Sequence, residues 1–99
     1  MADFNTIHIF RFGHVQIISK DKSITKKASD LTKLQPVIDD IWAKKPSDTT
    51  NIKEYHVINI FNGMFVDWLT KSKDEKNFRL PYSDLNQTKI NALINELNA

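Results

Sequence analysis

Basic and aromatic side chains recur near one another along this chain, and they are the residues with the clearest binding chemistry. Lysine and arginine neutralise phosphates, and aromatic rings stack on unpaired bases for about 1–3 kcal/mol each. The candidate stacking residues are Phe10, Tyr55 and Trp68, and the candidate phosphate-binding residues are Arg11, Lys20, Lys22, Lys26, Lys27, Lys71, Lys73, Lys76 and Arg79. This set predicts binding of single-stranded nucleic acid. The simpler alternative is that these lysines only keep exposed loops and sheet edges soluble.

Metal binding is not indicated by the three histidines, His8, His14 and His56. No two of them have a ligand spacing such as i, i+4 on a helix. The chain also has no cysteine, which excludes disulfides, thiolate nucleophiles and cysteine-ligated zinc. We therefore expect no metal.

Catalysis has only weak candidates. Asp39 and Asp40 fall on the polar side of an expected helix, and Asp67 lies within an expected strand beside Trp68. No nucleophile is paired with a base, and a chain with only two glycines is poorly suited to a glycine-rich phosphate loop. We expect a protein that is not an enzyme and that holds no cofactor.

Length and composition indicate one globular domain, residues 1–99. Hydrophobic residues make up 40% of the chain, and the net charge of +2 is too small to identify a partner. No stretch approaches the roughly 18 apolar residues of a membrane span, and the start of the chain does not resemble a signal peptide. We expect a cytoplasmic protein that does not enter membranes.

An internal repeat organises the sequence. Residues 4–20 align without a gap to 55–71, with five identities in seventeen positions: Ile7/Ile58, Ile9/Ile60, Phe10/Phe61, Val15/Val66 and Lys20/Lys71. Ordinary composition gives roughly one identity by chance. The predicted organisation is repeat 1 over residues 4–43, repeat 2 over 55–98 and a polar linker over 44–54.

Each repeat is expected to form three antiparallel strands and a helix. Asn62-Gly63 predicts a two-residue type I′ hairpin, and Gly13-His14 predicts a type II′ turn. The third strands, within 23–31 and 77–85, both end in Ser-Asp-Leu, where the Ser and Asp suit a helix N-cap. The helices show apolar stripes at helical spacing (Leu34, Val37, Ile38, Ile41 and Ile90, Leu93, Ile94, Leu97), with the first helix starting near Leu34 or Gln35. The fold class is α+β, with antiparallel sheets, two helices and a pseudo-twofold axis.

The expected hairpin register sorts the strand residues into two faces. Pairing Phe61 with Met64 places an aromatic-rich set on one face: Phe4, Phe10, Phe12, Val15, Ile17, Tyr55, Val57, Asn59, Phe61, Met64, Val66 and Trp68. It places an aliphatic set on the other face: Ile7, Ile9, Ile18, Ile58, Ile60, Phe65 and Leu69, with His56 and Asp67. Two helices cover one face only, so the aromatic face is expected to meet the other repeat's sheet, a partner subunit or a ligand.

The segment Val66-Asp-Trp-Leu69, the charged loop after it and Phe78-Arg-Leu-Pro81 resemble two related families. They are the single-stranded-DNA-binding domains of the positive-cofactor-four type coactivators and the purine-rich-element-binding (PUR) repeats. PUR repeats occur in tandem and clasp into one globule, although those families have four strands per repeat and this sequence predicts three. The resemblance implies nucleic-acid binding on the sheet through basic and aromatic residues.

Two functions follow from these observations. The first is a small, non-enzymatic, dimeric or pseudo-dimeric binder of single-stranded nucleic acid. The second is a protein-interaction module (a subunit, adaptor or inhibitor) that uses the apolar sheet face against another protein or a second copy of itself.

Overall fold

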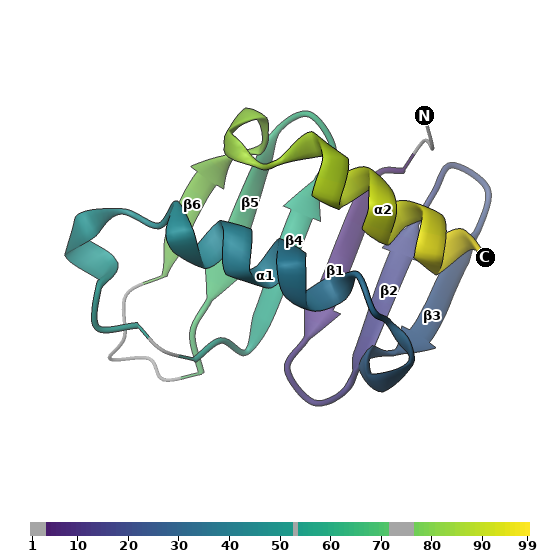
Figure 1. Ribbon diagram of the computed structural model, residues 1–99, viewed down its shortest axis with the longest axis horizontal. Helices are drawn as coiled ribbons and strands as arrows, with labels where there is room; N and C mark the ends of the chain where they lie inside the picture. Colours follow the sequence, from purple (N-terminus) through teal and green to yellow (C-terminus); the bar gives the residue numbers. More distant parts are fainter. Residues whose placement is uncertain (1–3, 53, 72–76) are drawn as a thin grey trace.

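The computed structural model describes residues 4–52, 54–71 and 77–99. Figure 1 shows a single sheet with two helices in front of it. The strands are β1 (Thr6–Phe10), β2 (His14–Ile18), β3 (Ser23–Lys27), β4 (Val57–Phe61), β5 (Phe65–Leu69) and β6 (Phe78–Pro81). The helices are α1 (Leu34–Ala43) and α2 (Gln87–Asn98), and three short 3-10 turns lie at Ala28–Asp30, Ser47–Thr49 and Tyr82–Asp84. The predicted α+β class is confirmed.

One antiparallel ladder joins the two halves of the chain. The six strands have the order β3-β2-β1-β4-β5-β6, so β1 and β4 are neighbours at the centre. His8 lies opposite Asn59, with Ile7 opposite Ile60 and Ile9 opposite Ile58. The two expected three-stranded meanders are therefore parts of one continuous sheet, and they do not form two sheets packed against each other.

Both helices cover the same face of this sheet and run in opposite directions across it (Figure 1). Strand burial alternates, which marks one face packed on the core and one face open. The covered face contributes ten buried side chains: Ile7, Ile9, Val15, Ile17, Ile58, Ile60, Val66, Trp68, Phe78 and Leu80. The predicted helix stripes meet them, since all of the stripe residues are buried except Ile38, which is partly buried.

The expected helix caps are wrong, although the predicted start at Leu34 is right. Ser29-Asp30 and Ser83-Asp84 lie in 3-10 turns, and each α-helix begins several residues later. Asn86 is the N-cap of α2, and its side-chain oxygen accepts a hydrogen bond from the Lys89 amide at 3.2 Å. A Ser-Asp pair suits any tight turn with free amides, so it cannot distinguish a 3-10 turn from a helix start.

The predicted two-residue hairpin turns are also wrong. Ile60 pairs with Val66 and Val57 with Leu69, so Asn62, Gly63 and Met64 form a three-residue loop. Among the described residues only Gly13 and Gly63 have positive φ, whereas a type I′ turn would require it of Asn62 as well. The first hairpin likewise turns through Arg11, Phe12 and Gly13, because Phe10 pairs with His14.

One extra loop residue moves every side chain of the following strand to the opposite face. The expected faces hold for the strand residues of β1 and β4 but are reversed for β2 and β5. Val15, Ile17, Val66 and Trp68 lie beneath the helices, whereas Ile18, Phe65, Asp67 and Leu69 lie on the open face. Phe4, expected on the open face, is also buried, and its ring lies 6.2 Å from that of Tyr82.

The two helices cap each other's starting segments through carboxylates. Glu96 near the end of α2 accepts hydrogen bonds from the hydroxyl and amide of Thr32 and from the amide of Lys33, at 2.6, 2.9 and 2.8 Å. Asp40 near the end of α1 accepts one from the amide of Asn86 at 2.8 Å. Each carboxylate thus satisfies amides that the opposite helix leaves free, next to the positive end of its dipole.

These contacts lower the pKa of both carboxyl groups. Burial acts to raise the pKa of Asp40, but the hydrogen bond from the Asn86 amide and the pairing with Lys44 outweigh burial. The pKa of Glu96 is lowered by the Thr32 hydroxyl and by the amides of Lys33 and Thr32. A folded-state pKa below the unfolded value adds stability above the unfolded pKa, and this stability is lost as the pH falls through the folded pKa.

We therefore predict acid destabilisation that depends on these carboxylates. Asp40→Asn should lower the free energy of unfolding by about 0.3–1 kcal/mol at pH 7, because an amide keeps the hydrogen bond but loses the negative charge beside the start of α2. The difference should shrink as the pH falls and the wild-type carboxyl group takes up a proton. Glu96→Gln should change stability in the same direction. Urea denaturation followed by circular dichroism measures both. Asp39→Asn is the matched control, since Asp39 bonds only to Gln35 of its own helix among the described residues; an equal effect there would contradict the prediction.

Candidate interaction surface

The uncovered side of the sheet, here called the open face, carries its side chains in three rows that run across the strands. The Phe10 row consists of Lys27, His14, Phe10, Val57 and Leu69. The His8 row consists of Thr25, Gln16, His8, Asn59, Asp67 and Arg79. The Phe61 row consists of Ser23, Ile18, Thr6, Phe61, Phe65 and Pro81. Two partly apolar rows therefore flank a polar one.

Aromatic rings group at two places on the open face. Phe61 and Phe65 lie with ring centroids 4.8 Å apart. Phe10 stacks on His14 at 4.6 Å, with 28° between the ring planes. These three phenylalanines are partly exposed, because no described helix lies over this side. The open face is thus less aromatic than expected, since the reversed register removes Trp68 from it.

The polar row is internally bonded. His8 Nδ1 and Asn59 Oδ1 lie 2.6 Å apart at the centre of the sheet. Arg79 Nε donates to Asp67 Oδ1 at 2.7 Å, and the Arg79 guanidinium also lies over the Phe65 ring at 4.0 Å from its centroid. Asp67, a weak catalytic candidate in the sequence, is therefore the cross-strand partner of Arg79.

Two of the three expected stacking residues belong to an aromatic cluster on the helix side. Trp68 is only 2% exposed. Its ring stacks on Phe78 at 5.4 Å and meets Trp42 at 5.6 Å and Tyr55 at 4.9 Å. Burial raises the pKa of the Tyr55 hydroxyl. Phe10 is the one expected stacking residue that the open face presents.

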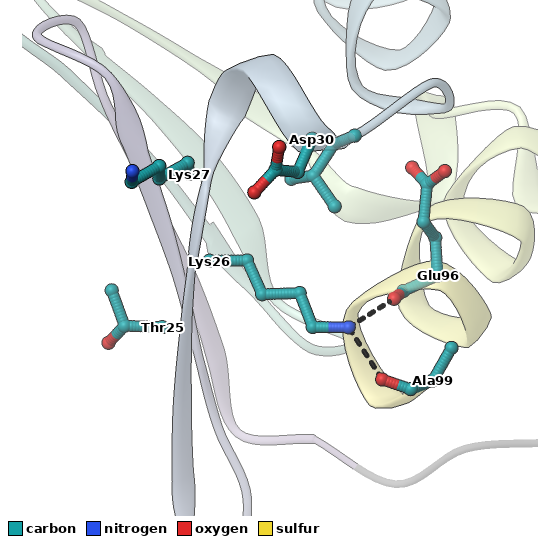
Figure 2. A pocket seen from close by; sticks show the side chains of 7 residues that line it. Thr25, Lys26, Lys27, Asp30, Glu96 and Ala99 are labelled. Carbon is teal, nitrogen blue, oxygen red and sulfur yellow. Dashed lines mark hydrogen bonds between the residues drawn. The ribbon is translucent and has the colours of Figure 1, made fainter.

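Two of the expected phosphate-binding residues hold other parts of the protein together. Arg11 Nη1 lies 3.0 Å from Glu54 Oε2. Lys26 points to the helix side, where its Nζ donates to the carbonyl oxygens of Glu96 at 3.0 Å and Ala99 at 2.6 Å. Figure 2 shows Lys26 reaching from β3 to the end of α2, across a pocket of ≈ 530 Å³ that Asp30 also lines. Cations are favourable at the C-terminal end of a helix, so Lys26 has a structural role there.

The remaining basic residues lie far apart. Lys27 is exposed on the open face beside His14. Lys20 and Lys22 lie in the β2–β3 turn at the Thr6 end of the sheet, whereas Lys71 follows β5 at the opposite, Phe10 end. Lys73 and Lys76 lie outside the described residues. The members of this set that the structure describes therefore do not form one continuous track.

Sequence reasoning missed the partners of these charges. The ion pair between Asp67 and Arg79 is predictable from the sequence once the β5–β6 register is known, because that register makes the two residues direct cross-strand neighbours. No sequence pattern predicts the contacts of Lys26 with α2 or of Arg11 with Glu54. The residues of each contact are far apart along the chain and meet only in the folded protein.

Comparisons with known proteins identify no relative. No protein-family model, curated protein or solved structure matches the chain. Over residues 4–52, 54–71 and 77–99, no group of three His, Asp or Glu side chains is arranged to hold a metal ion. None of the helices in those same ranges is long and apolar enough to cross a bilayer.

The register makes a clear prediction for the two aromatic residues of β5, which lie on opposite faces of the sheet. Trp68→Ala should destabilise the fold by about 3–5 kcal/mol, because it empties a site in the core. Phe65→Ala should cost about 1 kcal/mol or less, because that ring faces solvent. Urea denaturation of the two variants measures the difference, and the reverse order would contradict the register.

Proposed function

We propose that this chain is a non-enzymatic binding protein that binds another protein through the open face of its sheet. The observation that supports this most directly is a broad sheet surface, uncovered by the described helices, with half-buried apolar residues in the Phe10 and Phe61 rows. Exposed apolar surface is typical of protein interaction sites.

The charges of the open face favour a protein partner over nucleic acid. Its three rows contain three formally charged residues, Lys27, Asp67 and Arg79, and the last two form an ion pair. Depletion of charge together with exposed phenylalanine and arginine is the composition of a protein interface. A site for single-stranded nucleic acid needs several free cations along a continuous groove.

Single-stranded nucleic acid binding is the second candidate. Lys27, His14 and Phe10 are adjacent in one row, which places a free cation beside stacked rings. Phe12 next to them is 72% exposed. The resemblance to the positive-cofactor-four and PUR families supports the same candidate.

We also propose that the chain arose by duplication and has a pseudo-twofold axis between His8 and Asn59. The sequence repeat relates each residue of repeat 1 to the residue 51 positions later in repeat 2. By this relation the strand pair Thr6–Phe61 corresponds to the pair Val57–Phe10, and both pairs are present in the β1–β4 ladder. The pair Ile7–Ile17 of the first hairpin likewise corresponds to Ile58–Trp68 of the second. Asp40 and Glu96 have matching roles on α1 and α2. Duplication of one unit accounts for all of these correspondences.

A matched set of variants tests the proposed interaction. The double substitution Phe61→Ser/Phe65→Ser should abolish capture of a partner from cells that express the full chain, with little change in stability. Phe12→Ser is the control, because it removes an equally large, more exposed ring that lies in the β1–β2 loop outside the three rows. Quantitative affinity purification compares the proteins retained by each variant. A partner set that is the same for the double variant and the wild type would overturn the open face as the binding site.

The nucleic-acid alternative requires a separate titration. We expect no binding of a labelled oligothymidylate at low salt. Binding that weakens steeply with salt, and that Lys27→Glu reduces, would replace the proposed function with the second candidate. Lys27 suits this test better than Lys26, whose substitution would also disturb the end of α2.

A further inference from the structure

The outer edge of β3 offers unpaired backbone groups. In the β2–β3 ladder the Ala28 amide donates to Gly13 at 2.8 Å and the Ser19 amide to Lys22 at 2.8 Å. Hydrogen-bonded pairs alternate along an antiparallel ladder, so Ile24 and Lys26 turn their amides and carbonyls toward β2. Ser23 and Thr25 therefore direct both groups outward, away from the sheet, and Lys27 directs its amide outward while its carbonyl oxygen begins the Ala28–Asp30 turn. Since β3 is an edge strand, no other strand of the sheet meets them.

The opposite edge of the sheet is blocked. The Tyr82 amide donates to Met64 at 3.1 Å, and the same alternation makes Arg79 and Pro81 the outward residues of β6. Pro81 has no amide hydrogen, and an edge proline prevents the addition of another strand. At the corresponding place β3 has Lys27, since Lys27 pairs with the first residue of β2 and Pro81 with the first residue of β5.

From this asymmetry we infer that β3 pairs antiparallel with β3 of a second copy of this chain, with Thr25 opposite Thr25. Thr25 then exchanges two hydrogen bonds with Thr25 of the second copy, and the Lys27 amide donates one to the Ser23 carbonyl of the second copy. Ser23 lies opposite Lys27 of the second copy, and Lys27 lies opposite its Ser23. The twofold axis runs perpendicular to the sheet, so the two sheets join into one and both open faces lie on the same side.

The side chains support this register. Lys27 faces a serine and Lys26 faces Ile24, so no two lysines are opposed across the junction, and the central Thr–Thr pair is a favourable one. Like-charged residues directly opposite each other would oppose pairing, as a register that set Lys27 against Lys27 would do. Lys26 is held back against the end of α2 and does not obstruct the edge. On the helix side of β3, a pocket of ≈ 530 Å³ lies between Lys26, Asp30 and the end of α2 (Figure 2).

This pairing uses the edge of the sheet and goes beyond the proposed function, which uses the open face. The two are compatible, because the His8 row of one copy continues through Thr25 into the same row of the other copy. Loss of one interaction does not remove the other. Failure of the open-face proposal would appear in partner capture, and failure of the β3 pairing would appear in the dissociation constant of the dimer.

Lys27→Pro tests the pairing because it places a proline on β3 at the position that corresponds to Pro81 of β6. Lys27 has φ −69° and ψ 135°, close to the φ −61° and ψ 139° of Pro81, so a proline fits without strain. Its outward amide makes no bond within the sheet. For such a small interface we expect wild-type dimers with a dissociation constant of about 10–100 µM by analytical ultracentrifugation. Lys27→Pro should raise this constant at least about tenfold while the circular dichroism spectrum stays unchanged.

Three further variants separate backbone pairing from other effects. Lys27→Ala keeps the amide and should still dimerise. Ser23→Lys, which places a lysine opposite Lys27 of the second copy, should weaken the dimer even if Lys27→Pro does not fold. Ser23→Glu should strengthen it in a salt-sensitive way. A wild-type chain that is monomeric at about 1 mM, a folded Lys27→Pro variant that dimerises like the wild type, or equal effects of Ser23→Lys and Ser23→Glu would overturn the inference.

Discussion

The pairing of β1 with β4 is the contact on which the rest of this structure depends. It joins two three-stranded meanders that are far apart in sequence, and it sets His8 opposite Asn59 at the centre of one sheet. Because side chains alternate along every strand, this single register puts Ile7, Ile9, Ile58 and Ile60 on the same face. That face gives the two helices one continuous apolar surface to cover.

Two helices on one face leave the other face uncovered, and this arrangement separates the residues that hold the fold from those of the proposed binding surface. The covered face holds the core, including the Trp68 cluster, so changes there act first on folding. The open face presents apolar rows around a bonded polar row, so its residues are available to a partner at a smaller cost in stability. The edge strands add a further difference, because Pro81 closes one edge and the backbone of β3 leaves the other open.

The charges show why a residue count is a poor guide to a binding surface. Arg79 pairs with Asp67, Arg11 lies against Glu54, and Lys26 bonds to the end of α2. A basic side chain that already pairs with a carboxylate or a helix end has to give up that contact before it can bind phosphate. Asp40 and Glu96 act in the same structural way, since each fixes the start of the opposite helix. These charged side chains therefore stabilise the fold through their contacts with other segments of the chain.

The sequence by itself determined the order of elements, the helix stripes and the aliphatic composition of the core face of β1 and β4, because these depend on local periodicity. It did not determine the faces of β2 and β5, since a hairpin loop one residue longer reverses an entire strand, and Asn-Gly suits more than one loop. Only the tertiary structure decided that the meanders form one sheet, that Trp68 is buried and that the basic residues within the described ranges lie apart. Those outcomes depend on strand pairing and side-chain contacts between distant segments, which local sequence patterns do not encode.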